Sequence, residues 1–372
     1  MVSRRQVLID GSAAVIVSSG MERFVTQSHA AVNPANLSDH ADQRGLFYGC
    51  AVELESLRDA AMAEAVRQEC GIIVPSWEAK RDIVEPAPRE YNFAPIDEIM
   101  KFAKTNKLLF RGHVLVWHRA NPPWLLRELI ERPSEDLLTD YVSTVVRRYR
   151  RRVHSWDVVN EAVDLNDGRP DGLRRTPFLE AFGPRYIDLA FRAARAADPH
   201  ALLMYNEYDI EYADNDDRRA AVLALLSGLV SRKVPVDALA IQGHLRAYRK
   251  TFDASVFRRF LSDVAGLGLR IIVSELDVID RGGSKAIKDR DAAVATMTTE
   301  LLDIALEQPN TIGVLTWGLS DRYTWLTDDD LGMWPDGQPS RVLPLDVDLA
   351  RKPMWHAMAA AFDRAAKRPR RV

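Results

Sequence analysis

The sequence predicts an α/β fold, a single (β/α)8 TIM barrel that occupies residues 31–372. Eight short apolar runs rich in β-branched residues recur along the chain, and such runs are typical of buried strands. Amphipathic stretches with apolar residues at helical spacing separate most of these runs. An open doubly wound sheet is the alternative. That fold expects a Gly-rich phosphate turn after an early strand, which Tyr48–Ala51 does not supply.

The predicted elements alternate along the chain, and no linker or repeat interrupts them. The predicted strands are Leu46–Val52, Ile72–Pro75, Leu108–His113, Ser155–Asn160, Ala201–Asn206, Ala238–Gln242, Arg270–Glu275 and Gly313–Trp317. The predicted helices include Asp97–Lys104, Pro133–Arg151, Pro184–Ala197, Asp216–Ser231, Ala254–Leu267 and Asp289–Gln308. After the last strand, Leu319–Pro344 is rich in Asp, Gly, Trp and Pro, and we expect a loop over the barrel rim.

The composition is that of a globular protein with a large core. Of the 372 residues, 47% are hydrophobic and 28% are charged, and the net charge is −3. This balance gives no reason to expect binding to nucleic acid or to a membrane, and we expect a monomer. The basic run Arg147–Arg152 is predicted to be a solvated helix face, and Lys367–Arg371 a frayed tail.

The first thirty residues have the features of an export signal. Arg4 and Arg5 match a twin-arginine pattern, a modestly apolar stretch Ala13–Val17 follows, and Ser28–Ala30 matches a small-x-small cleavage site. The apolar stretch is too short to span a bilayer. We therefore predict that residues 1–30 are a signal peptide for a periplasmic or secreted protein. A disordered leader on a cytosolic protein is the alternative.

The two cysteines lie on or near the first two predicted strands. Neighbouring strands are about 4.8 Å apart, so Cys50 and Cys70 are equally compatible with a disulfide and with two buried thiols. The chain has no Cys-x-x-Cys or His-Glu-x-x-His spacing. The sequence therefore predicts no metal site.

Two glutamates end buried strands in matching settings. Glu161 ends the run Trp156–Glu161, and Glu275 ends the predicted strand that begins at Arg270. A carboxylate at the tip of a buried strand is costly unless a site uses it. On the rim of a barrel, two of them suggest the acid and nucleophile of a glycosidase. The alternative is a pair of structural carboxylates held by Arg or Lys.

Histidines, amides and tryptophans gather where other predicted strands end. Carbohydrate sites need this mixture, because indoles stack on sugar faces while amide, imidazole and carboxylate groups hold hydroxyls. These residues are His113, Trp117, His118, Tyr205, Asn206, Gln242, His244, Trp317, Asp321 and Trp325.

With these residues in view, the chain resembles glycoside hydrolase family 10, the retaining β-1,4-xylanases. The resemblance extends from Phe47 to Trp355 and implies a polysaccharide or oligosaccharide substrate and no cofactor. The motifs that carry it, in the family's order, are Gly112–His118 (Gly-His-Val-Leu-Val-Trp-His), Trp156–Glu161 (Trp-Asp-Val-Val-Asn-Glu), Tyr205–Tyr208, Gln242–His244, Ser274–Asp277 and Trp317–Asp321.

The resemblance also implies roles for individual residues. Glu161 would be the general acid/base and Glu275 the nucleophile, supported by Asn160, His244 and Asp277. Asn160 would donate to the sugar 2-hydroxyl. The implied substrate-binding residues are Lys80, His113, Trp117, Gln242, Trp317 and Trp325. Trp117 is equally compatible with a core position beneath the floor of the site.

Two segments depart from the family pattern. Where the family usually has Pro-Glu-Asn-Glu-Met-Lys-Trp, Pro75–Arg81 reads Pro-Ser-Trp-Glu-Ala-Lys-Arg. Ser76 and Trp77 therefore replace the pair that grips the second glycone sugar, and Trp77 either stacks on that sugar or blocks it. The family's Trp-His-Ser-Gln is Trp-His-Arg-Ala here, so Ala120 replaces a sugar-binding amide. Each lost hydrogen bond costs about 1 kcal/mol.

The sequence therefore predicts a retaining endo-β-1,4-xylanase with altered glycone subsites. One alternative is the same chemistry on a decorated or acidic xylo-oligosaccharide or on a β-glucan. The other is a catalytically silent carbohydrate-binding protein of the periplasm. Both glutamates and their supporting residues are retained, which argues against the silent binder, because binding alone needs neither an acid nor a nucleophile.

Overall fold

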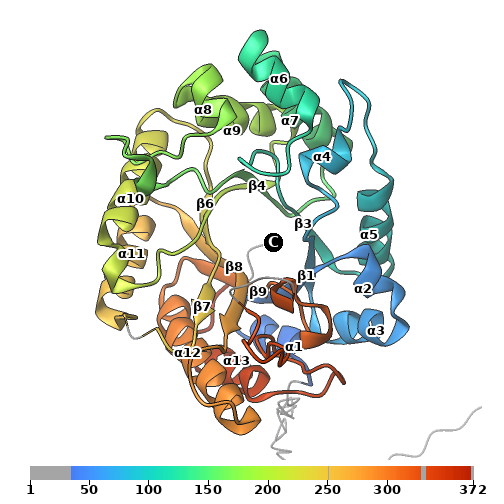
Figure 1. The fold of residues 1–372 in the computed structure, drawn as a ribbon, viewed down its shortest axis with the longest axis vertical. Coiled ribbons are helices and arrows are strands. Elements are labelled where there is room, and N and C mark those ends of the chain that lie inside the picture. Colours follow the sequence, from blue (N-terminus) through green and yellow to red (C-terminus); the bar gives the residue numbers. More distant parts are fainter. Residues whose placement is uncertain (1–34, 250, 328–331, 370–372) are drawn as a thin grey trace, which may run out of the picture. The chain divides into compact units, whose positions relative to one another are not determined.

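The computed structural model describes residues 35–249, 251–327 and 332–369, which form a closed barrel of parallel strands (Figure 1). The predicted signal peptide lies outside the described residues. Each strand pairs with its neighbours in chain order, and pairing of the last strand with the first closes the barrel. The barrel strands are β1 (Phe47–Val52), β2 (Ile72–Pro75), β3 (Leu109–Gly112), β4 (Ser155–Asn160), β5 (Leu202–Glu207), β6 (Ala238–Ile241), β8 (Arg270–Ile279) and β9 (Thr311–Thr316).

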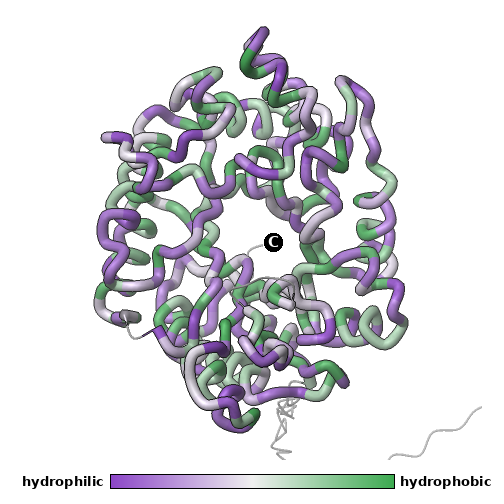
Figure 2. The backbone as a smooth tube through the Cα atoms, in the orientation of Figure 1, coloured by the Kyte–Doolittle hydropathy of each residue, from purple (hydrophilic) through white to green (hydrophobic). Residues whose placement is uncertain are grey.

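Helices surround the strands as an outer ring, which confirms the predicted (β/α)8 architecture (Figure 1). They are α1 (Leu37–Asp42), α2 (Leu54–Arg58), α3 (Ala60–Glu69), α4 (Arg81–Val84), α5 (Ala94–Thr105), α6 (Pro123–Glu131), α7 (Asp136–Arg148), α8 (Pro177–Phe182), α9 (Arg185–Ala197), α10 (Asp216–Ser231), α11 (Ala254–Gly266), α12 (Ile287–Glu307) and α13 (Pro353–Arg364). Short 3-10 turns occupy Leu165–Asp167, Ala213–Asn215, Asp321–Tyr323 and Trp325–Thr327. Hydrophilic and hydrophobic residues alternate along the helices, as an outer ring requires (Figure 2).

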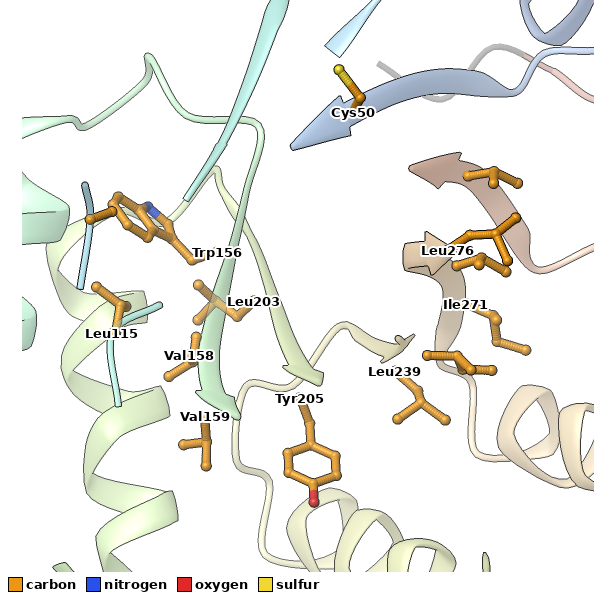
Figure 3. Close-up of a cluster of buried hydrophobic side chains, with 14 of the residues drawn as sticks. Cys50, Leu115, Trp156, Val158, Val159, Leu203, Tyr205, Leu239, Ile271 and Leu276 are labelled. Atoms are coloured by element: carbon orange, nitrogen blue, oxygen red, sulfur yellow. The ribbon is translucent and has the colours of Figure 1, made fainter. Parts of the chain in front are cut away.

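The side chains of each strand alternate between two apolar cores. On β5, Met204 points into the barrel, while Leu203 and Tyr205 pack against the helices. Ile72 and Val74 of β2 likewise point inward. Figure 3 shows part of the outer core, where side chains of β4, β5 and neighbouring strands meet. Because successive side chains of a strand point to opposite faces, each strand contributes side chains to both cores.

The seventh barrel strand is longer than predicted. We expected it to end at Glu275, but β8 continues to Ile279. An extra short strand, β7 (His244–Arg246), pairs with this extension and sets His244 opposite Asp277. Between β6 and β7 the chain turns through Gly243, whose φ is +77°, a conformation that favours glycine. The turn therefore delivers His244 to the side of β8.

Cys50 and Cys70 are buried, unjoined thiols with sulfur atoms 3.5 Å apart. Within the described ranges, no helix combines the length and the apolar character that a membrane crossing requires.

Candidate active site

The two predicted catalytic glutamates lie at the end of the barrel where parallel strands finish. Glu161 directly follows β4, and its backbone N–H donates to the Asn206 carbonyl at 2.9 Å. Glu275 lies within β8, and its backbone N–H donates to the Gln242 carbonyl at 2.9 Å. Glu161 has a φ of +55°, which is rare for a residue with a side chain and costs of order 1–3 kcal/mol. The surrounding structure must therefore hold this conformation.

Three side-chain amides connect the two carboxyl groups. Gln242 donates to Oε1 of Glu161 at 3.1 Å and to Oδ1 of Asn160 at 3.2 Å. Asn206 donates to Oε1 of Glu275 at 2.6 Å and to the same Asn160 oxygen at 2.9 Å. Asn160 in turn donates to Glu161 at 3.2 Å. The two carboxyls thus share one hydrogen-bond network, in which Asn160 is the common member.

Glu275 is held as a carboxylate although it is only 4% exposed. Burial by itself raises its pKa, but His113 at 3.9 Å, His244 at 3.3 Å and the Asn206 amide outweigh burial and lower it to about 2. The group is therefore ionised throughout the neutral range. A buried, ionised carboxylate is the state that a nucleophile needs.

His244 supplies positive charge to this carboxylate. Its Nε2 faces Oε2 of Glu275, and its Nδ1 lies 2.9 Å from Oδ1 of Asp277. Burial opposes protonation, but Asp277 and Glu275 raise the pKa of His244 well above its usual value. Trp325 donates its indole N–H to the other Asp277 oxygen at 2.8 Å. Asp277 therefore fixes both the imidazole and an indole of the rim.

His113 is held from below by a buried ion pair. Its Nδ1 lies 3.0 Å from Asp157, which also pairs with the guanidinium of Arg111. All three side chains are at most 3% exposed. Among the described residues, His113, Asp157 and Glu275 offer atoms close enough for a metal ion. The Arg111 cation already neutralises Asp157, so this cluster fits an ion-pair network better than a metal centre.

The surroundings of Glu161 are more open than those of Glu275. Its side chain is 15% exposed, and His118 Nδ1 lies 3.7 Å from its Oε2. Burial lowers the pKa of His118 to about 4, so this imidazole is neutral at working pH. Arg174 donates to the Glu161 carbonyl at 2.8 Å and pairs with Asp164 at 2.8 Å. The guanidinium thus helps to hold the unusual backbone of Glu161.

Lys80 lies between two indoles on the other side of the site. Its Nζ is 3.9 Å from the ring centroid of Trp77 and 4.7 Å from that of Trp117. Burial lowers the pKa of Lys80 to about 8, against the opposing charges of Glu275, Asp82 and Glu161. Trp77 is 49% exposed, whereas Trp117 is half-buried. Trp77 is therefore the indole that faces solvent.

Glu207 is a structural carboxylate at a strand end, and it can be compared with Glu161 and Glu275. It ends β5, is fully buried and receives hydrogen bonds from Arg218 at 3.2 Å and from the Val163 N–H at 3.2 Å. Burial raises its pKa to about 7, although Arg218 opposes this. Glu207 fits the alternative of an Arg-held carboxylate, whereas the partners of Glu275 are histidines and an amide.

The structure brings the predicted site residues into one cluster. The edges of the Trp317 ring and the imidazoles meet, with ring centroids 5.1 Å from His113 and 6.4 Å from His244. Gln242, predicted to bind sugar, has its amide committed to Glu161 and Asn160. Arg111, Asp157 and Arg174 were not among the predicted site residues. Arg111 and Asp157 left a signal, because each is a charged residue inside a predicted buried strand, whereas Arg174 left none.

In this arrangement, one carboxyl group can act as the nucleophile of a displacement reaction and the other as its proton donor. One is buried, ionised and contacted by two histidines and an amide, and the other is more exposed and linked to it by amides. Indoles and a lysine border both. This set suits attack on one sugar carbon with proton transfer to its leaving oxygen.

Known proteins are similar to this chain in sequence and in fold. The family model described as Glycosyl hydrolase family 10 matches residues 36–361. The chain is 33% identical over 315 residues to endo-1,4-beta-xylanase B of Thermotoga neapolitana, covering 84% of this chain and 86% of that protein. It is 31% identical over 324 residues to endo-1,4-beta-xylanase C of Phanerodontia chrysosporium, covering 85% and 76%.

Solved structures agree with these relatives. Native xylanase 10B from Thermotoga maritima superposes with a TM-score of 0.78 at 31% identity, covering 88% of this chain and 98% of that one. Xylanase 10B from Thermotoga petrophila RKU-1, in complex with xylobiose, gives 0.80 at 30% identity, covering 89% and 98%.

Proposed function

Because the chain belongs to glycosyl hydrolase family 10, we propose that it is a retaining endo-β-1,4-xylanase that cleaves xylan or xylo-oligosaccharides. The observation that carries this proposal is the buried, ionised Glu275 joined to Glu161 through shared amides. The similar proteins of three Thermotoga species and of Phanerodontia chrysosporium are named as xylanases, and one of the solved structures is a complex with xylobiose.

The proposed reaction is a double displacement. Glu275 attacks the anomeric carbon while Glu161 gives its proton to the departing glycosidic oxygen, which leaves a glycosyl ester on Glu275. Glu161, now a carboxylate, then takes a proton from a water that attacks the same carbon. The ester breaks, Glu275 leaves as a carboxylate, and the configuration at carbon is retained.

The neighbouring residues are proposed to support these steps. His244, held by Asp277, and His113, held by Asp157, favour the ionised form of Glu275. Asn160 is proposed to donate to the 2-hydroxyl of the reacting sugar.

We propose that the sugar rings lie along the indoles. Trp317 and Trp325 stand on the Glu275 side, and Lys80 with Trp77 border the same region. The replacements at Ser76, Trp77 and Ala120 support altered glycone binding, and they favour a second candidate, the same reaction on a decorated xylo-oligosaccharide. The chain lengths released from xylohexaose and glucuronoxylan separate the two.

The test of the proposed function uses two matched variants. Glu275→Gln keeps the shape of the nucleophile and is expected to lose roughly 10³-fold or more in kcat on xylohexaose. Glu161→Gln is expected to lose polymer hydrolysis but to form the glycosyl ester from an aryl xylobioside, whose good leaving group needs no acid. Added azide is then expected to restore its turnover as a β-xylobiosyl azide. Full turnover by Glu275→Gln would falsify the assigned nucleophile.

We also propose export through the signal peptide predicted at residues 1–30. Support comes from the twin arginines and the small-x-small site alone. N-terminal sequencing of protein recovered outside the cytoplasm is expected to begin at Ala31. Replacement of both Arg4 and Arg5 by lysine is expected to keep the unprocessed chain inside. Active cytoplasmic protein with an intact leader contradicts this proposal.

A further inference from the structure

A cavity of about 350 Å³ opens beside the catalytic cluster. It lies between the residues that follow β1, the residue that follows β2 and the segment that follows β9. This volume is in the range of small-ligand pockets, which is roughly 300–1,000 Å³. Its lining includes Glu53, Ser76, Trp317 and Trp325.

The two indoles connect this cavity to the nucleophile. The Trp317 ring meets the edges of His113 and His244, both of which contact Glu275. Trp325 donates to Asp277, the partner of His244. A ligand in the cavity is therefore contiguous with a sugar held over Glu275.

The position of the cavity in the barrel indicates which part of a glycan would bind there. Three strands separate β4, which carries Glu161, from β9 in either direction around the barrel. The part of the cavity beside β9, which Trp317 and Trp325 line, thus lies across the barrel from the proposed proton donor, and the cavity extends from there past β1 to β2. The proton donor stands on the leaving-group side of the scissile bond. The cavity accordingly lies on the glycone side.

Glu53 gives the cavity a fixed hydrogen-bond acceptor. It directly follows β1, its side chain is exposed, and its Oε1 accepts from the Ser76 hydroxyl at 2.7 Å. Ser76 itself is only 8% exposed, so its hydroxyl is committed to this contact. A carboxylate has about four lone-pair sites, so Glu53 keeps capacity for sugar hydroxyls. Ser76 thus orients a carboxylate that belongs to the neighbouring strand.

We propose that Glu53, oriented by Ser76, binds the hydroxyls of the glycone ring next to the reacting one and determines specificity there. This inference rests on the proposed xylanase function. Glu53 supplies from β1 the carboxylate that the segment after β2 lacks, where Ser76 and Trp77 stand. Trp317 and Trp325 form the apolar walls for the ring.

The proposal also predicts which decorations are tolerated. A carboxylate accepts well from free hydroxyls and repels a second carboxylate at short range. The ring bound by Glu53 is therefore expected to carry no uronic acid. In the oligosaccharides released from glucuronoxylan, the penultimate ring counted from the new reducing end is expected to be undecorated. Glu53→Gln removes this repulsion and is expected to raise the share of products decorated there.

The test compares substrates that differ by one glycone ring. An aryl β-xyloside fills only the reacting position, whereas an aryl β-xylobioside with the same leaving group also reaches Glu53. Glu53→Ala is expected to lower kcat/KM on the xylobioside by roughly tenfold or more and to leave the xyloside unchanged. Ser76→Ala is expected to act in the same direction but less, because Glu53 remains and loses only its orientation.

A matched control removes another exposed glutamate. Glu64 on α3 pairs with Arg67 and does not line the cavity, so Glu64→Ala is expected to change neither substrate. Equal losses on both substrates, or no loss on the xylobioside, overturn the role of Glu53. A folded wild-type protein that cleaves neither substrate nor xylohexaose overturns the proposed function instead. Thermal unfolding of each variant separates these outcomes from misfolding.

Discussion

At the scale of single residues, Lys80 carries a charge that depends on its surroundings. Burial lowers its pKa to about 8 from an ordinary value of 10.5. Above pH 8 the amine becomes neutral and loses charge-assisted hydrogen bonds to sugar hydroxyls. We expect kcat/KM on xylo-oligosaccharides to fall above about pH 8. We expect Lys80→Arg to lack this fall, because a guanidinium stays charged.

The direction of the stability change makes this prediction specific. The folded state binds fewer protons at Lys80 than the unfolded state between pH 8 and pH 10.5. Stability due to this group therefore rises with pH in that window while activity falls. Rate profiles from pH 6 to 10 and melting curves over the same range check both signs. An alkaline fall that persists in Lys80→Arg assigns it to another group.

A site residue could be predicted from the sequence when its immediate neighbours in the chain reveal its role. Glu161 and Glu275 are visible in the sequence because each interrupts an apolar run. The contacts of His113 with Asp157, and of Asp157 with Arg111, could not be predicted from the sequence. They join side chains of adjacent strands, and no local pattern specifies the register of those strands. The contact of Glu53 with Ser76 is hidden for the same reason.

At the scale of elements, the turn between β6 and β7 gives a testable case. A Cβ at Gly243 would lie 3.2 Å from Val273, and φ there is +77°. Gly243→Ala is expected to cost about 1–2 kcal/mol of stability and to displace His244, which lowers kcat. Gly268 is a matched control, because its φ is +81° and a Cβ there would contact nothing within 4 Å.

The two glycine variants are compared by denaturant unfolding and by kcat on xylohexaose. Gly268→Ala is expected to lose stability from backbone strain alone and to keep full kcat. If both variants keep full kcat, the turn does not position His244.

Apart from the end of β8, the bounds of the barrel strands were predicted to within about two residues, because continuous apolar runs signal strands buried on both faces. The end of β8 was missed, because the polar residues Ser274, Glu275 and Asp277 end the continuous apolar run, and because its partner β7 follows a separate strand. Several helices were not predicted. Among them, α1 and α2 are only one to two turns long, which leaves little periodicity to detect.

At the scale of the whole molecule, Glu69 joins segments that are far apart in the sequence. It ends α3 and is 5% exposed, and its carboxylate accepts from Arg351 at 2.7 Å, from the Trp355 indole at 3.0 Å and from the Leu37 N–H at 2.9 Å. It thus ties the first described helix to the last. Glu69→Ala is expected to destabilise the fold by about 2–4 kcal/mol, because buried donors lose their acceptor.

This change is expected to leave KM and kcat unaltered below the melting range, because Glu69 lies near the start of β2, away from the strand ends that carry the site. Asp363 pairs with His40 near the same helices but is 46% exposed. Asp363→Asn is therefore expected to change stability by less than about 1 kcal/mol. Chemical denaturation of both variants checks the contrast, and equal losses would refute the argument from burial.

The fold class followed from the strand and helix alternation, because a barrel needs only repeated units of the same kind. The hydrogen bonds between distant segments of the chain could not be predicted from the sequence, because each depends on a single polar contact across the closed ring.

The amide network between the two glutamates branches from Asn206, and on both branches the donors point toward a glutamate. The Ser274 hydroxyl donates to Asn206, Asn206 donates to Asn160 and Glu275, and Asn160 donates to Glu161. The last donor on each branch, the amide of Asn206 or of Asn160, therefore points its positive end toward a carboxyl oxygen. In water, solvent molecules would have to turn each time charge moved between the two carboxyls. Here folding has already completed that reorientation, so little reorganisation energy remains for the chemical step.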